Sequence, residues 1–200
     1  MGDTALKHLA IGIDLGATKI AAALVDRQGV VVENRRSATG ARDGPADVVE
    51  RIADIACDLL NGSPAPVTGI GIGTPGYVDP VSGIVTNAVN LGWDTVGLVD
   101  ELRRCLSSRT NKHLPIWAEN DANVMALGEY HYGSAQHCGN FVHVCIGSGL
   151  GSGIIVDPIA GGSGDDSQCI HQRNTGGKCD GQGTAKARDG RLFQNTADNG

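Results

Sequence analysis

The sequence has few aromatic residues, no excess of basic charge and no long apolar run, and each shortage excludes a class of protein. Only 4% of its 200 residues are aromatic, and 16 lysines and arginines stand against 22 acidic residues, a net charge of −6. This charge offers no basic surface for nucleic acid. No stretch approaches the ~18 uninterrupted apolar residues of a membrane-spanning helix, and the first residues lack the charged and then apolar order of a signal peptide. The sequence therefore predicts a cytoplasmic protein without a nucleic-acid or membrane partner.

Paired cysteines are also missing. The six cysteines are spread from Cys57 to Cys179 without a C-x-x-C pair. This spacing favours reduced thiols over a disulfide framework or an assembled zinc site. The length sets a further bound, because 200 residues can form one good core and a fragment of a second domain.

Regular hydrophobic patterning covers the chain up to about Asp157. Three short strands with tight connections come first, and helices then alternate with strands. The expected strands are 9–13, 20–25, 30–36, 67–72, 114–118, 140–146 and the start of another at 154–156. The expected helices are 45–62, 98–106 and 122–132. This order predicts an α/β fold.

The last 43 residues, 158–200, break this pattern. They contain nine glycines but only four large apolar residues, Ile159, Ile170, Leu192 and Phe193. So few apolar side chains cannot offset the entropy lost on ordering the segment. We therefore expect an ordered domain over residues 1–157 and a disordered, Gly-rich tail over 158–200, which a shifted reading frame would also produce. A long surface insertion is the alternative.

The first of four chemistry-bearing stretches is Asp14-Leu15-Gly16-Ala17-Thr18-Lys19, between the first two expected strands. Glycine lets backbone N–H groups approach an anion closely, while Thr18 and Lys19 add donors and charge. Asp14 can hold a metal ion or its bound water. The stretch is not a Walker A loop, because a strand rather than a helix follows it. A plain hairpin turn is the alternative interpretation.

The second stretch, Gly71-Ile72-Gly73-Thr74-Pro75-Gly76, formally matches the dinucleotide pattern G-x-G-x-x-G. The dinucleotide site needs a helix at the third glycine, and Pro80 disfavours one there. We therefore exclude NAD binding and expect a glycine turn that lets a ligand approach the backbone.

The third and fourth stretches are Glu119-Asn120-Asp121 and the glycine-rich run 147–153. Asn120 or Asp121 is expected to cap the following helix. A carboxylate at the end of a strand also lies where α/β sheets bind ligands, so Asp121 could accept the proton of a sugar hydroxyl during phosphoryl transfer. The backbone of residues 147–153 and the Ser148 hydroxyl could cradle phosphate oxygens, or the run is a glycine-rich hairpin.

Taken in order and together with Asn90-Leu91-Gly92-Trp93, these stretches closely resemble the ROK family of sugar kinases and repressors over residues 9–157. The resemblance implies a ribonuclease H-like, actin-like ATPase fold, in which sugar and ATP lie between two α/β domains. This chain resembles the N-terminal domain.

The resemblance also implies roles for individual residues. ATP with Mg²⁺ and a hexose would be the ligands, and Asp121 the general base that takes the proton of the attacking hydroxyl. Ser148 stands where the family usually has threonine. The implied first phosphate loop contains Asp14, Gly16, Thr18 and Lys19, the second contains Gly147, Ser148, Gly149 and Gly151, and the sugar site contains Asn120, Asp121, Gly76 and Asn90.

The chain also departs from the family. The family's Glu-x-x-Gly-His sugar segment, its cysteine-rich zinc motif and most of its second domain, with most of the oligomer surface, have no counterpart after Asp157. No metal ligand is therefore assigned to His171 or Cys179. The expected function is glucokinase-like hexose 6-phosphorylation by family, with catalysis by this chain and the choice of sugar left open. The alternatives are a non-catalytic remnant and a repressor without its DNA-binding helices, as only eight residues precede Leu9.

Overall fold

The computed structural model of the chain describes residues 8–136, 138–146 and 150–156. It also describes the backbone of three two-residue strands, β11 (Gln168–Cys169), β12 (Ala185–Lys186) and β13 (Leu192–Phe193). The predicted disordered tail therefore lies almost entirely outside the described residues.

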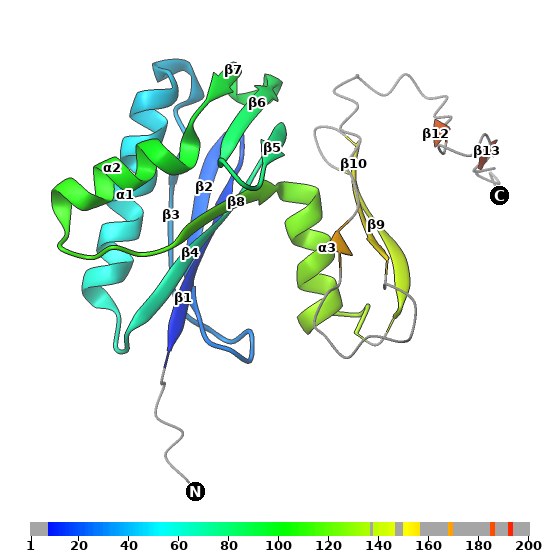
Figure 1. Ribbon diagram of the computed structural model, residues 1–200, viewed down its shortest axis with the longest axis horizontal. Coiled ribbons are helices and arrows are strands. Elements are labelled where there is room, and N and C mark those ends of the chain that lie inside the picture. Colours follow the sequence, from blue (N-terminus) through cyan, green and yellow to red (C-terminus); the bar gives the residue numbers. More distant parts are fainter. Residues whose placement is uncertain are drawn as a thin grey trace, which may run out of the picture.

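A five-stranded mixed sheet forms the centre of the molecule (Figure 1). Its first three strands form an antiparallel meander, and the last two run parallel to β1. This arrangement confirms the expected meander followed by strands that alternate with helices. In sheet order, the strands are β3 (Val31–Ala38), β2 (Lys19–Val25), β1 (Leu9–Leu15), β4 (Val67–Thr74) and β8 (Ile116–Asn120).

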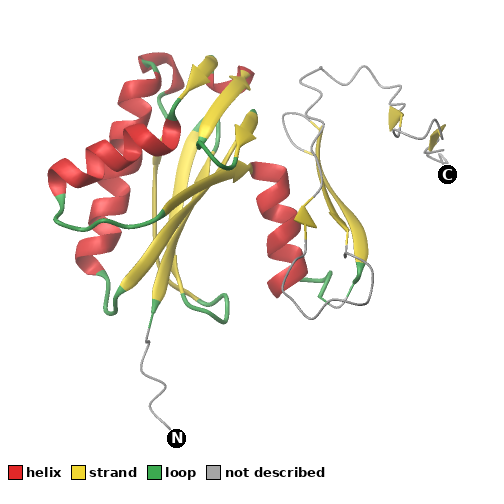
Figure 2. Cartoon of the chain, viewed as in Figure 1, coloured by secondary structure: helices red, strands yellow, loops and turns green. Residues whose placement is uncertain are grey.

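The main core lies between the sheet and two helices, α1 (Pro45–Gly62) and α2 (Leu98–Arg109), which cover one face (Figure 2). Strand β1 shows why, because its burial alternates strictly along the chain. Leu9, Ile11, Ile13 and Leu15 are buried, whereas the residues between them are exposed. Asp14 therefore lies on the side of the sheet away from α1 and α2. No helix within the described ranges is long and apolar enough to span a membrane.

A small antiparallel sheet between β4 and α2 was not predicted from the sequence. It contains β5 (Tyr77–Asp79), β6 (Ile84–Ala88) and β7 (Trp93–Val96), with η2 (Val89–Leu91) before β7. The turn between β5 and β6 is closed by Asp79, which accepts hydrogen bonds from the Val81 N–H and the Ser82 hydroxyl. Because strand β5 follows Gly76, the dinucleotide pattern lacks its helix, as expected.

On the other side of the sheet, α3 (Asp121–Tyr132) packs against a hairpin of β9 (Asn140–Ile146) and β10 (Leu150–Val156) (Figure 1). The expected loop over residues 147–153 is wrong in length. Strand β10 begins at Leu150, because Leu150 pairs with Ile146 and Gly151 pairs with Cys145. Only residues 147–149 connect the two strands, and these lie outside the described residues.

Candidate active site

Two of the predicted stretches, those that contain Asp14 and Asp121, lie where three parallel strands end. Strands β1, β4 and β8 run in the same direction, so their carboxyl ends meet at one edge of the sheet. Asp14 is level with Gly73, and Gly73 is level with Glu119. The structure thus brings the Asp14 and Glu119–Asp121 stretches to the same edge, although about a hundred residues separate them in the sequence.

The first predicted phosphate loop is the tight turn between β1 and β2. The Gly16 N–H donates to the Lys19 carbonyl at 3.0 Å and closes the turn. A Cβ atom on Gly16 would lie 3.1 Å from that same oxygen, so a larger residue would crowd the turn. The Thr18 and Lys19 side chains are exposed, which leaves both free to meet a ligand.

Asp121 is the first residue of α3, and its carboxylate is half-buried. The Ala122 N–H donates to Asp121 Oδ1 at 2.8 Å and fixes the carboxylate in place. Burial raises the pKa of the Asp121 carboxyl above its ordinary value; the hydrogen bond from Ala122 lowers this pKa, and the negative charge of nearby Asp14 raises it. A raised pKa is the property that a carboxylate needs to act as a general base near neutral pH.

Asn120 forms the junction between β8 and α3. Its side chain caps the helix, because Oδ1 accepts from the N–H groups of Ala122 at 2.9 Å and Asn123 at 3.4 Å. Its Nδ2 donates to the carbonyl of Gly76 at 3.0 Å and to that of Thr74 at 3.4 Å. Asn120 has no exposed surface, and these bonds engage both ends of its amide. The expected helix cap is confirmed, while the sugar contact of Asn120 stays a prediction.

Two residues near this junction, Glu119 and Asn123, were given no role of their own by sequence reasoning. Glu119 Oε1 accepts from the Asn120 N–H at 2.7 Å and from Asn123 Nδ2 at 3.0 Å. Asn123 is buried, and its Oδ1 has no hydrogen-bond partner among the described residues. The four-residue spacing from Glu119 to Asn123, which bridges the cap, is the sequence signal that could have revealed this pair.

The two other predicted sugar residues lie in different surroundings. Gly76 is in the turn after β4 with a φ of +97°, and a Cβ there would lie 2.8 Å from the Thr86 carbonyl oxygen. Only glycine fits this position, and its carbonyl receives the Asn120 amide. Asn90 is exposed in η2, between β6 and β7. Both roles stay predictions.

The second predicted phosphate loop is described only at Gly151, since Gly147, Ser148 and Gly149 lie outside the described residues. Gly151 lies within β10, and a Cβ there would be 3.3 Å from the Cβ of Ala122. A Cβ on Gly153 would be 2.5 Å from the Ala122 carbonyl oxygen. In the described structure, therefore, these two glycines allow β10 to approach α3 closely.

Strand β9 also reaches the vicinity of Asp121. Cys145 Sγ lies 3.3 Å from Met125 Sδ on α3. Burial raises the pKa of the Cys145 thiol, and the negative charge of Asp121 raises it further. The four cysteines whose side chains are described are free thiols, and the described residues contain no group of three or more potential metal-ligating side chains.

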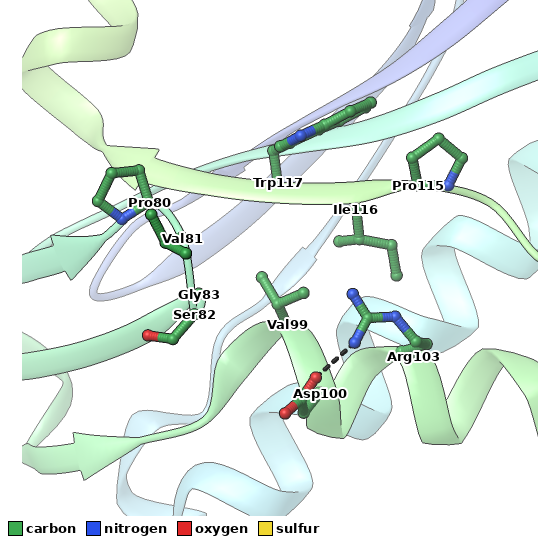
Figure 3. Close-up of a pocket in the computed structure, with 10 residues that line it drawn as sticks. All are labelled: Pro80, Val81, Ser82, Gly83, Val99, Asp100, Arg103, Pro115, Ile116 and Trp117. Atoms are coloured by element: carbon green, nitrogen blue, oxygen red, sulfur yellow. Dashed lines mark hydrogen bonds and ion pairs between the residues drawn. The ribbon is translucent and has the colours of Figure 1, made fainter.

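A cavity of about 490 Å³ lies elsewhere, at the outer edge of β8 (Figure 3). It is bounded by the turn after β5, the first turns of α2 and residues Pro115, Ile116 and Trp117. An Asp100–Arg103 ion pair lines one wall. None of the predicted site residues that the structure describes lines this cavity, so the candidate site is the strand-end edge rather than this hollow.

Known proteins similar to this chain include sugar kinases and repressors. The ROK family model matches residues 10–173, which extends beyond Asp157. A glucokinase from Halalkalibacterium halodurans is 33% identical over 150 residues, which cover 74% of this chain and 44% of that protein. A putative xylose repressor from Caldicellulosiruptor is 34% identical over 151 residues, covering 74% of this chain and 36% of that protein.

A solved structure with a similar fold also belongs to this family. A ROK family glucokinase from Streptomyces griseus, in complex with glucose and AMPPNP, is 36% identical with a TM-score of 0.65, and the match covers 74% of this chain and 44% of that one. The expected mixed α/β, actin-like ATPase fold is confirmed by this similarity. The chain spans less than half the length of these relatives. On the strength of the family match and these relatives, the chain belongs to the ROK family.

Proposed function

We propose that the chain acts as part of an ATP-dependent sugar kinase of the glucokinase type, with Asp121 as the general base. The observation that carries this proposal is the half-buried Asp121 carboxylate, held at the same sheet edge as the end of β1 and influenced by the charge of Asp14. The relative from Streptomyces griseus, bound to glucose and AMPPNP, supports the same pair of ligands for this chain.

In this mechanism, Asp121 accepts the proton of a sugar hydroxyl, usually O6 of a hexose. The hydroxyl oxygen forms a bond to the γ-phosphorus of ATP, the bond between that phosphorus and the β,γ-bridging oxygen breaks, and ADP leaves. Burial and the charge of Asp14 make the Asp121 carboxylate a stronger base than an exposed aspartate, because both raise its pKa. The Ala122 N–H keeps the carboxylate oriented. Asn120 and Glu119 hold the backbone on which Asp121 sits.

The phosphates of ATP would bind the β1–β2 turn, where Thr18 and Lys19 are exposed. The second predicted loop, with Gly147, Ser148 and Gly149, would contact a second set of phosphate oxygens. Mg²⁺ prefers oxygen ligands, and the exposed Asp14 carboxylate beside the turn fits this preference, directly or through water. When bound, the ion neutralises charge on the transferred phosphoryl group.

A coupled assay for ADP release tests this proposal, with glucose, fructose, mannose and N-acetylmannosamine as acceptors. We expect turnover with at least one sugar, and we expect Asp121→Asn to lower kcat by about 10²- to 10⁴-fold, the contribution of a positioned general base. Asp58→Asn is the matched control, because Asp58 is exposed on α1, on the far face of the sheet. Equal activity of the Asp121→Asn variant and the wild type would refute the assigned base.

A sugar-sensing protein without catalysis is the second candidate, favoured by the 34% identity with the putative xylose repressor. Calorimetry with the same sugars separates the two functions. A sensor binds sugar and shows no turnover with Mg·ATP, whereas a kinase binds Mg·ATP and consumes it.

A further inference from the structure

Thr39 lies directly after β3 and beneath the β1–β2 turn, and it is fully buried. Its hydroxyl donates to the Gly16 carbonyl at 2.6 Å, and its backbone N–H donates to the Thr18 carbonyl at 3.0 Å. Thr39 therefore binds the turn at two points, from a position 23 residues beyond Gly16.

These hydrogen bonds occupy carbonyl groups of the turn but not all of its N–H groups. The carbonyls of Gly16 and Thr18 are engaged by Thr39, and the carbonyl of Lys19 is engaged by the Gly16 N–H. Carbonyl oxygens repel an anion, whereas N–H groups attract one. Within the described residues, the N–H groups of Ala17 and Thr18 donate to no protein acceptor. The turn thus keeps its acceptors occupied within the protein and leaves these donors for a ligand.

Thr39 is itself held by α1. Arg51 Nη1 donates to the Thr39 carbonyl at 2.9 Å, and Arg51 Nη2 forms an ion pair with Asp43 at 2.5 Å. Gly40, with a φ of +63°, allows the chain to change direction immediately after Thr39. A continuous set of contacts therefore runs from α1 through Thr39 to the turn.

We propose that Thr39 is a positioning residue that orients the β1–β2 turn for anion binding. The proposal rests on the proposed function, in which this turn binds the phosphates of ATP. Thr39 has no exposed surface, so its proposed role is to hold the turn rather than to contact a ligand. It acts by keeping the Gly16 and Thr18 carbonyls directed into the protein.

The test compares Thr39→Val, which removes only the hydroxyl bond to Gly16, with Thr39→Ser, which keeps it. Thr68→Val is the matched control, because the Thr68 hydroxyl donates to the Leu9 carbonyl at 3.1 Å, at the opposite end of β1. Two quantities are measured on the full chain: hydrogen–deuterium exchange of the Gly16 amide, which donates to the Lys19 carbonyl and closes the turn, and the Kd of Mg·ATP by calorimetry. Arg51→Met, which releases the Thr39 carbonyl, is the second variant should Thr39→Val fail to fold.

We expect Thr39→Val to speed exchange of the Gly16 amide and to raise the Kd of Mg·ATP, each by about tenfold, the scale of one net hydrogen bond. Thr39→Ser should match the wild type, Arg51→Met should change both quantities in the same direction, and Thr68→Val should leave them unchanged. Unchanged exchange in Thr39→Val, or in Arg51→Met if that variant must serve, overturns the proposal. A serine variant that behaves like the valine variant overturns it as well.

Absence of Mg·ATP binding by the wild type would be a separate result. It would contradict the kinase proposal, whereas the exchange comparison needs no ligand and still decides whether Thr39 holds the turn.

Discussion

Replacing Asn120 should show whether the β8–α3 junction depends on its buried amide. Asn120→Ala removes the helix cap formed by Oδ1 and both hydrogen bonds donated by Nδ2. Asn120→Asp keeps an oxygen at the capping position but replaces the donor with an acceptor that faces the Gly76 and Thr74 carbonyls. The pair of variants therefore separates the cap from the contact with the turn after β4.

The cost follows from the number of bonds lost. Loss of a helix cap costs about 0.5–2 kcal/mol, and each net hydrogen bond contributes about 0.5–1.5 kcal/mol. Counting the 3.0 Å bond to Gly76 in full and the 3.4 Å bond to Thr74 in part, Asn120→Ala should lower the free energy of unfolding by about 1–4 kcal/mol. Asn120→Asp should be destabilised at neutral pH and recover in acid, where the buried carboxyl is protonated and can again donate.

Urea denaturation at pH 7 and at pH 5, followed by circular dichroism, measures these free energies. An Asn120→Ala variant within about 0.5 kcal/mol of the wild type would refute the structural role, because changes of that size are typical of unconstrained surface sites. If stability is unchanged but sugar affinity falls, Asn120 acts instead as a contact for the sugar, as the resemblance to the family implies.

Two further substitutions test the surroundings of Asp121. Asp121→Asn should raise the melting temperature at pH 7–8, because it removes a half-buried charge near Asp14. Since the pKa of Asp121 is raised in the folded state, this gain in stability should shrink as the pH falls through the folded-state pKa and vanish below the pKa of the unfolded chain. Thermal melts at several pH values measure the effect. Gly153→Ala should lower the free energy of unfolding by about 1–3 kcal/mol in urea titrations, because the new Cβ would meet the Ala122 carbonyl oxygen. Gly71→Ala is the control, since open space surrounds its Cβ position, and it should stay within about 0.5 kcal/mol of the wild type. Equal effects of the two glycine substitutions would contradict the close packing of β10 on α3.

The elements that were predicted correctly are those with a long hydrophobic period. Helix α1 was expected over residues 45–62, and its buried residues form one apolar stripe. The sheet of β5, β6 and β7 was missed because its strands span only three to five residues, too few for a period to emerge. Pro80 and Gly83 were the available turn signal, and Pro80 was interpreted only as a reason against a helix.

Some features of the candidate site could also be predicted from local sequence, and others could not. The types of residue at the strand ends and the helix cap at Asn120 follow from local sequence, because capping and strand ends are set by neighbours within a few residues. The roles of Gly151 and Gly153 do not follow from local sequence. Glycine is required at both positions because α3 approaches them closely, and not because of the loop before them. The length of the second loop depends on the pairing of β9 with β10, which the glycine-rich composition masks.

The sequence by itself determined an α/β chain with a carboxylate at the end of a strand, a glycine turn between two strands, and the order of motifs that marks the ROK family. Only the tertiary structure decided that Thr39 supports the turn at Gly16, 23 residues away, and that Asn120 binds the carbonyl of Gly76, 44 residues away. The physical reason is that periodicity and capping record the surroundings of each residue along its own element. Contacts between elements instead depend on the order of strands in the sheet, which brings distant strand ends to one edge.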